Sequence, residues 1–281
     1  MKKILSIVLV LAVIFTLASC GKGTDKGSSD PDNTSSKPDN TSGNVTDDSD
    51  LDYVKSNGKI VIGYTDYAPM NYNDENGKFT GFDTELAIIV CEKLGLEPEF
   101  VEINWDTKEV ELNAKSIDCI WNGLTIDEDR QATMEITKPY VKNAQVVLVK
   151  EGTDYESTAS LIGKNVAAEQ GSAGEKAIQT DENLKQANFV PKTLQTECLI
   201  EVKAGTSDAA VLDLTLANTM TGEGTSYQDI LIVDYLSEEY YGVAFRKGSD
   251  ICAEVNKLFD ELVADGTMGK LAEKYGLDLA E

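Results

Sequence analysis

Short apolar stretches alternate with longer amphipathic stretches along most of the chain after residue 58. In the first half, residues 59–65, 97–103 and 117–123 have the composition of buried strands, and residues 81–95 and 106–116 have helical periodicity. This alternation predicts a mostly parallel β-sheet that is covered by helices.

The helix predicted over residues 81–95 has clear sequence limits. Asp83 is suited to cap its N-terminus, and Gly95 is suited to end it. Its apolar positions, among them Leu86 and Val90, fall on one face. We expect that face to pack against the sheet.

The second half of the chain repeats this order of elements. Residues 165–170, 187–192 and 208–213 are predicted strands, with a helix from about residue 172 and another through 196–205. The repetition predicts a second α/β unit that resembles the first.

Two further β-rich segments, residues 143–152 and 240–248, link these two halves. The chain that follows them, over residues 250–266 and 267–276, is helical and needs a sheet to cover. If it returns to the first half, the chain forms two α/β lobes that are joined by two crossing strands.

We predict that lobe 1 comprises residues 51–145 together with 242–281, and that lobe 2 comprises residues 146–241. The two crossing strands would then serve as the hinge. The cleft between the lobes is the expected ligand site, because α/β proteins bind small molecules at strand ends and domain interfaces.

The N-terminus has the pattern of an export signal. Lys2 and Lys3 precede an uncharged apolar run over residues 4–17, and small residues follow up to Cys20. The letters LASC resemble the bacterial lipobox, which predicts removal of residues 1–19 and lipidation of Cys20. The alternatives are a secretory signal with a chance cysteine, or a transmembrane helix, for which the run is shorter than the required ~20 residues.

Residues 20–50 are rich in Gly, Ser, Thr, Asn, Asp and Pro and contain hardly any apolar side chain. Such a segment cannot bury enough surface to offset the conformational entropy lost on ordering, so we predict a disordered tether. The protein is therefore expected on the outer face of the cell membrane, held there by its lipid.

Charge and composition narrow the possible partners. The chain carries a formal net charge of −24, which repels nucleic acid and gives no attraction to anionic lipid. Histidine is absent, which excludes His-ligated metal sites and histidine-based catalytic centres. We expect a monomer with no metal and no cofactor.

Four cysteines follow the lipobox, at positions 91, 119, 198 and 252, and none forms a C-x-x-C pair. Three lie in predicted lobe 1 and only Cys198 lies in lobe 2, so two disulfides would tie moving lobes together. We expect buried free thiols, with one disulfide within lobe 1 as the alternative.

One short motif, IWNGLTIDEDR, carries candidate binding chemistry. Its strand-like run is expected to break at Asn122-Gly123, and Arg130 follows Thr125 by five residues. A guanidinium binds a carboxylate through two parallel donors, a geometry that lysine lacks. The alternative is a surface ion pair of Arg130 with a neighbouring acid of the same segment.

Two sequence stretches carry a family resemblance. GFDTELAIIVCEKLG resembles the signature of the polar-amino-acid family of bacterial solute-binding proteins, the receptors of ABC importers, and GLTIDEDR is similar to its G-x-T-x-x-x-x-R segment. The similarity covers roughly residues 55–277, with the lipobox before them and GVAFRKGSD near the end. The letters WN before Gly123 and the short GYTDYAPM segment depart from the commonest forms.

The resemblance implies a two-lobed, type II periplasmic-binding-protein-like fold. It also implies a receptor that binds an L-amino acid by closure of the cleft and delivers it to the permease of an ABC importer. No catalytic role is expected of such a receptor.

The residues expected to contact the ligand come from both lobes. In lobe 1 they are Asp66, Tyr67, Trp105, Asn122, Gly123, Thr125 and Arg130, and in lobe 2 they are Glu169, Gln170, Ser172, Ala173 and Asp213.

The carboxylate of an amino acid would meet Arg130 and an N–H or the hydroxyl of Thr125. Backbone N–H groups near Ser172 and Ala173, at the start of a helix, can donate to the same carboxylate. The alternative for Gln170, Ser172 and Ala173 is an ordinary helix start.

The ammonium group would meet a free carbonyl at Gly123 and the carboxylate of Asp213. The segments AKSIDCIWNG and KAGTSDAAVLD are locally similar, which places Asn122-Gly123 and Asp213 at the same strand end in the two halves. The alternative for Asp213 is a helix cap.

Four residues are expected around the ligand's side chain. By resemblance, Tyr67 and Trp105 flank it with flat apolar surface, with a core role as the alternative for each. Asp66 and Glu169 are acids near the mouth of this part of the pocket.

No lysine or second arginine is expected there, so a side-chain carboxylate would lose water without gaining a partner. We therefore predict a polar uncharged or cationic L-amino acid. Aspartate and glutamate should bind at least about a hundredfold more weakly. The alternatives of other classes are an extracytoplasmic enzyme resembling the cyclohexadienyl dehydratases, with Glu169 as general acid or base, and a sensory binding module.

Overall fold

The structure, a computed structural model, describes residues 49–280. The predicted export signal, the lipidation of Cys20 and most of the predicted tether fall on residues 1–48, which lie outside the described part. The last predicted tether residue, Asp50, is the first residue of a helix instead. No helix within residues 49–280 is long and apolar enough to cross a membrane.

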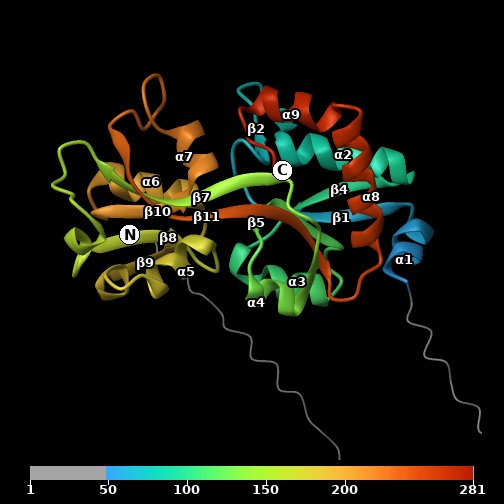
Figure 1. The fold of residues 1–281 in the computed structure, drawn as a ribbon, viewed down its shortest axis with the longest axis horizontal. Coiled ribbons are helices and arrows are strands. Elements are labelled where there is room, and N and C mark those ends of the chain that lie inside the picture. The colour runs from blue at the N-terminus through green and yellow to red at the C-terminus, as the bar shows by residue number, and fades with distance from the viewer. Residues whose placement is uncertain (1–48, 281) are drawn as a thin grey trace, which may run out of the picture. The chain divides into compact units, whose positions relative to one another are not determined.

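Nine strands form one continuous sheet through both lobes (Figure 1). Their order is β4-β1-β5-β11-β7-β10-β8-β9, with β6 paired to β11. The bounds are β1 (Lys59–Tyr64), β4 (Glu97–Glu102), β5 (Cys119–Thr125), β6 (Met134–Ile136), β7 (Val141–Lys150), β8 (Asn165–Glu169), β9 (Asn188–Lys192), β10 (Ala209–Asp213) and β11 (Ile230–Arg246). A separate two-stranded sheet pairs β2 (Tyr72–Asn73) with β3 (Phe79–Thr80).

The helices lie on both faces of this sheet. They are α1 (Asp50–Asn57), α2 (Phe82–Leu94), α3 (Lys108–Asn113), α4 (Glu128–Thr133), α5 (Ala173–Thr180), α6 (Gln195–Ala204), α7 (Leu214–Met220), α8 (Ile251–Ala264) and α9 (Thr267–Tyr275). Short 3₁₀ turns occur at Trp105–Thr107, Thr158–Leu161 and Leu184–Gln186.

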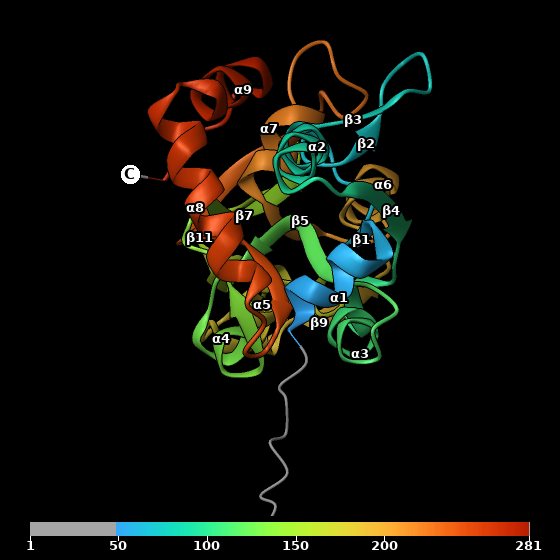
Figure 2. The same ribbon diagram turned by 90° about the vertical axis from the view of Figure 1, so that its right-hand side faces the viewer.

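In lobe 1 the strands β4, β1 and β5 are parallel, as the alternating pattern predicts. Figure 2 shows this lobe end-on, with α2 on one side of the strands and α3 and α4 on the other. Phe82 of α2 and Phe259 of α8 are buried in the core on one face, and Leu112 of α3 is buried on the other. The C-terminal helices α8 and α9 therefore pack in the same core as α2.

In lobe 2 the strands β10, β8 and β9 are parallel as well. Leu199 of α6 and Leu216 of α7 pack with Leu212 on one face. Ile178 of α5 packs with Val211 on the opposite face. Neighbouring residues of one strand thus point into two separate apolar layers.

The antiparallel strands β7 and β11 run through both lobes and connect them (Figure 1). Together with the parallel strands of each lobe, they confirm the two-lobed fold with two crossing strands. The predicted segment 240–248 covers only the last part of β11, which begins at Ile230. Its first half begins with an apolar run, ILIV, that was not predicted as a strand from the sequence, and its pairing with β7 has two irregularities.

The predicted N-cap of α2 is wrong. The N-cap is Gly81, two residues earlier, whose φ of 131° is accessible to glycine. A Cβ at Gly81 would lie 2.1 Å from the carbonyl oxygen of Met70. Asp83 lies inside the helix, and its buried carboxylate accepts hydrogen bonds from the Gly123 N–H and the Tyr140 hydroxyl, both at 2.7 Å.

The four cysteines within residues 49–280 are free and buried, as expected, and the alternative disulfide is not formed. Burial raises the pKa of Cys91 to about 12 and that of Cys252 to about 11. These thiols are therefore unreactive packing groups.

Candidate functional site

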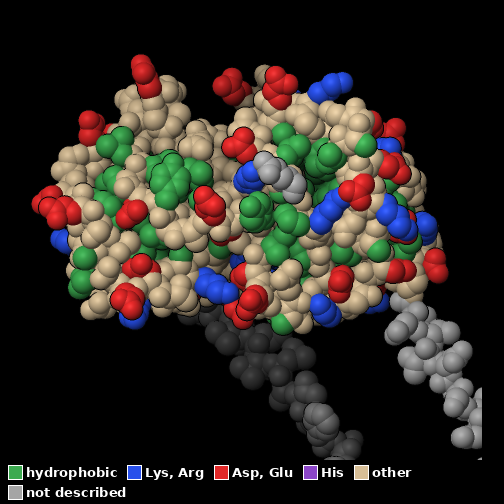
Figure 3. All heavy atoms as spheres, in the orientation of Figure 1, with side chains coloured by type: hydrophobic (Ala, Val, Ile, Leu, Met, Phe, Trp, Pro, Cys, Tyr) green, Lys and Arg blue, Asp and Glu red, His purple; other side chains and the backbone are tan. Residues whose placement is uncertain are grey.

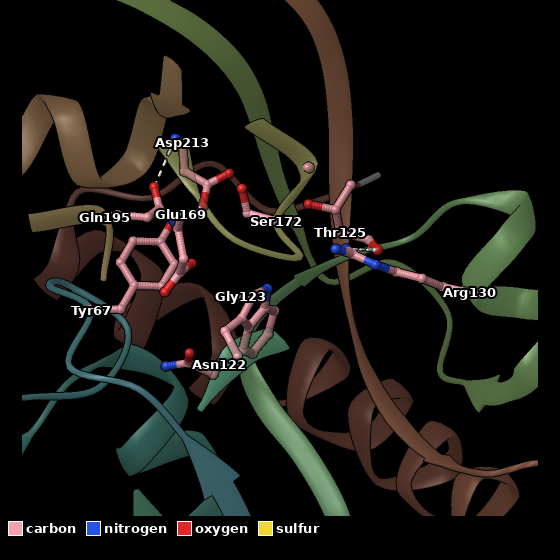
Figure 4. Close-up of a pocket in the computed structure, with 11 residues that line it drawn as sticks. Tyr67, Asn122, Gly123, Thr125, Arg130, Glu169, Ser172, Gln195 and Asp213 are labelled. Carbon is pink, nitrogen blue, oxygen red and sulfur yellow. Dashed lines mark hydrogen bonds between the residues drawn. The ribbon is translucent and has the colours of Figure 1, made fainter. Parts of the chain in front are cut away.

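A small enclosed pocket lies between the lobes, where β5, β8 and β10 end (Figure 4). Its volume is about 10 Å³, roughly the space of one water molecule. The lining residues are Tyr67, Trp105, Asn122, Gly123, Thr125, Arg130, Glu169, Ser172, Ala173, Gln195 and Asp213. The structure thus brings together every predicted contact residue except Asp66 and Gln170, and it adds Gln195.

Strand β5 supplies the floor of the pocket on the lobe 1 side. The strand does not end at the predicted break at Asn122-Gly123, because β5 continues to Thr125, but its pairing with β11 is interrupted between Ile120 and Leu124. Gly123 has a φ of 55°, and a Cβ at this position would lie 2.7 Å from the Tyr67 ring. Asn122 donates to the carbonyl of Thr65 at 2.9 Å, so it fixes the loop that carries Tyr67.

Arg130 lies on α4 and is only 7% exposed. Its guanidinium donates to the carbonyl oxygen of Thr125 at 2.8 Å and, across the cleft, to that of Gly171 at 3.3 Å. Its Nε lies 3.9 Å from the carboxylate of Asp127, so an ion pair exists but is long. The residue is buried in the pocket wall rather than on the surface.

Lys108, which the sequence did not single out, lies beside the pocket. Its ammonium donates to the carbonyl oxygens of Trp105 at 3.0 Å and Gly171 at 2.9 Å, and it lies 4.9 Å from the centre of the Trp105 ring. Burial, and then the nearby charge of Arg130, lower the pKa of Lys108 to about 8. Two lobe 1 cations therefore hold one carbonyl of lobe 2.

Asp213 ends β10 and is buried. Its carboxylate accepts hydrogen bonds from the side-chain amides of Asn143 at 2.8 Å, of Gln145 and of Gln195. Burial raises its pKa above the ordinary value. Asp213 occupies the N-cap position of α7, as the helix-cap alternative has it, but its side chain makes no capping bond to that helix.

Glu239 of β11 shares two of these amides. Its carboxylate accepts from Asn143 at 2.7 Å and Gln145 at 2.9 Å, and also from the Thr125 hydroxyl at 2.8 Å. Burial, and then the charge of Asp213, raise the pKa of Glu239 to about 7. A continuous set of hydrogen bonds thus joins Thr125 in lobe 1 to Asp213 in lobe 2 through the crossing strands.

The loop after β8 has both of the roles that were predicted as alternatives, an ordinary helix start and a part of the pocket wall. The Ser172 hydroxyl accepts the N–H of Glu175 at 3.1 Å, which is an ordinary helix N-cap. Ser172 and Ala173 nevertheless line the pocket. Gln170 is exposed and donates to Asp106 of lobe 1 at 3.1 Å, outside the pocket.

The two aromatic residues line the pocket and also belong to apolar cores. Tyr67 is 3% exposed, and its hydroxyl bonds to those of Thr215 and Tyr241. Trp105 is 5% exposed. Asp66, next to Tyr67, is exposed to solvent and is not part of the pocket lining.

Glu169 is the last residue of β8 and is 3% exposed. Its Oε1 has no hydrogen-bond partner among the described residues. Burial, and then the charge of Asp213, raise its pKa well above the ordinary value, whereas Lys108 and Arg130 act in the opposite direction.

Two lobes, two crossing strands and an enclosed polar pocket between the lobes define a type II binding protein for a small solute. Residues 60–278 match the bacterial extracellular solute-binding proteins, family 3. The chain belongs to this family, which confirms the resemblance read from its motifs.

Three similar proteins illustrate the family. The probable amino-acid-binding protein YxeM of Bacillus subtilis (strain 168) is 30% identical, over 96% of this chain and 94% of its own. Arginine-bound ArgBP from T. maritima, a Gly52Ala mutant, is 31% identical over 75% and 99% of the two chains, with a TM-score of 0.69. The ancestral amino acid-binding protein AncCDT-1, a precursor of cyclohexadienyl dehydratase, is 31% identical over 81% and 99%, with a TM-score of 0.74.

Proposed function

We propose that the protein is a receptor that binds one L-amino acid between its lobes and delivers it to the permease of an ABC importer. The observation that carries this proposal is the placement of Arg130 and Asp213 on the same enclosed pocket from opposite lobes. A free amino acid has a carboxylate and an ammonium on one carbon, so it can pair with both groups at once.

Closure and binding are one event in this proposal. The pocket volume of about 10 Å³ is far too small for an amino acid, so the lobes must open to admit one. Contacts such as Arg130 to Gly171 and Gln170 to Asp106 join the lobes directly. A ligand that replaces or adds to these contacts would favour the closed state.

The protein is further proposed to be a monomer that is held on the outer face of the cell membrane by lipid on Cys20. Acidic and basic side chains are intermixed on the face shown in Figure 3, in keeping with a surface that does not attract nucleic acid. Cys20→Ala should release the protein from membranes and leave ligand affinity unchanged. Retention on membranes after this change would contradict the anchor.

Screening identifies the ligand class most directly. Thermal-shift measurements against the twenty amino acids, cystine and ornithine should find at least one that raises the melting temperature with concentration, because it binds only the folded state. A panel in which nothing shifts the melting temperature would contradict the receptor function.

An enzymatic role is the second candidate, because a buried carboxyl with a raised pKa, Glu169, lies in the pocket. The similar proteins YxeM, TcyA and GlnH of Bacillus subtilis are named as binding proteins, and we propose that this chain has no catalytic role. Incubation with prephenate-like substrates should give no turnover. Turnover that is lost in Glu169→Gln would support the enzyme instead.

A further inference from the structure

Glu169 is the group in the pocket whose bonding is incomplete. Its side chain is 3% exposed, and Figure 4 shows its carboxyl group near Tyr67 and Gln195. Its Oε1 accepts no hydrogen bond from any described residue. A buried carboxyl oxygen without a partner costs free energy, so its position suggests a group that the ligand supplies.

The charges of the pocket also indicate that the ligand supplies a partner for Glu169. The charged side chains that line it are Arg130, Glu169 and Asp213. If the proposed function holds, the carboxylate and ammonium of the amino acid neutralise Arg130 and Asp213. One negative charge is left over, and a ligand with a positively charged side chain would balance it.

We infer that Glu169 determines ligand specificity by binding the guanidinium, ammonium or imidazolium group of a cationic L-amino acid. This inference rests on the proposed function. Tyr67 and Trp105 line the same pocket, and aromatic rings attract positive charge.

Lys108 does not take this role itself. Its ammonium is committed to the carbonyl oxygens of Trp105 and Gly171. Burial, and then the charges of Asp213 and of Glu197 of α6, raise the pKa of Glu169, whereas Lys108 and Arg130 act in the opposite direction. A cation bound beside Glu169 would lower this pKa, so binding of a cationic ligand should favour release of a proton.

The test compares the wild type with Glu169→Gln, which keeps the shape of the side chain and removes its charge. Calorimetry with all twenty amino acids, cystine and ornithine should find that arginine, lysine, ornithine or histidine binds the wild type most tightly. The affinity for that ligand should fall about 30-fold or more in Glu169→Gln, the effect of removing one partner of a buried charge pair. The affinity for the uncharged amino acid glutamine should change far less. Glu182→Gln, an exposed acid of lobe 2, is the matched control and should leave affinity unchanged.

Proton release gives a second readout. Binding enthalpies measured in two buffers of different ionisation enthalpy should show a proton released by the cationic ligand in the wild type, and none attributable to this group in Glu169→Gln. Unchanged affinity and unchanged proton release in Glu169→Gln would overturn the inference, as would glutamine or cystine as the tightest ligand. If no amino acid binds the wild type at all, the proposed function itself fails.

Discussion

The two lobes contribute opposite charges to the pocket between them. Lobe 1 contributes Arg130, with Lys108 just behind it, and lobe 2 contributes the acids Glu169 and Asp213. At the outer rim the signs are reversed, because Lys176 of lobe 2 pairs with Asp127 and Asp129 of lobe 1.

This difference separates two tasks. The rim pair is exposed on the Lys176 side and screened by water, so it can guide closure but adds little stability. The inner charges are buried, and each needs a partner of opposite sign. Lobe 1 is thus suited to hold the anionic end of a ligand, and lobe 2 its cationic parts.

Removal of the lobe 1 charge should have the largest effect. Arg130→Ala leaves the ligand's carboxylate unpaired, at a cost of about 2–5 kcal/mol. Affinity should fall about 30-fold to a few thousand-fold by calorimetry, at about 1.4 kcal/mol per decade. Circular dichroism should show an intact fold. Unchanged affinity would mean that Arg130 does not bind the ligand and serves only as an ion-pair partner of Asp127.

Removal of the lobe 2 charge should have a smaller effect. Asp213→Asn keeps the size of the side chain but loses a charged hydrogen bond to the ammonium, so affinity should fall about 10- to 100-fold. Asp154→Asn, an exposed acid of the same lobe, is the control. If the two variants bind alike, Asp213 does not contact the ligand.

Stability without ligand should depend on pH through Glu239. Its pKa is about 7 in the fold and about 4.3 in an unfolded chain, so between these values the folded state holds more protons. The free energy of unfolding should therefore fall as pH rises from about 4.3 to 7, by at most about 1.4 kcal/mol per pH unit. Urea titrations should show a shallower slope for Glu239→Gln. Asp83, with a pKa of about 7, adds in the same direction.

Removal of the rim ion pairs of Lys176 should have the smallest effect on ligand affinity. Lys176→Ala removes two ion pairs of an exposed side chain, each worth about 0.5 kcal/mol or less, so affinity should change less than about fivefold. The small effect should shrink further in high salt, which calorimetry at two ionic strengths can measure. A loss as large as that of Arg130→Ala would contradict the division between rim and pocket.

The sequence located the buried strands of the pocket, because a buried strand leaves a strong apolar signal. Asp213 is the last residue of β10, Gly123 lies two residues before the end of β5, and Arg130 follows at a motif spacing. The loop containing Ser172 was predicted from its position ahead of a helix. These assignments need only local pattern together with the rule that α/β sites lie at strand ends.

Other features depend on contacts between segments that are far apart in the sequence, and a local pattern cannot predict them. The sequence around Lys108 is that of an exposed helical lysine, but in the fold its ammonium contacts Gly171 of lobe 2. Gln195 begins a helix and reaches back to Asp213, and Glu239 lies in a short polar stretch, residues 237–239, just before the predicted segment 240–248. Asp83 looked like a cap because its tertiary partner, Tyr140, is far along the chain.

The hydrogen bonds from Thr125 through Glu239 and the amides of Asn143 and Gln145 to Asp213 run through the hinge itself. A change in lobe angle that lengthens any of these bonds would alter how strongly Asp213 holds its negative charge. The hinge is therefore an electrostatic element as well as a mechanical one. A permease that separates the lobes would weaken the proposed contact between Asp213 and the ligand's ammonium group before the ligand has moved. Opening of the lobes would then itself lower the affinity for the ligand.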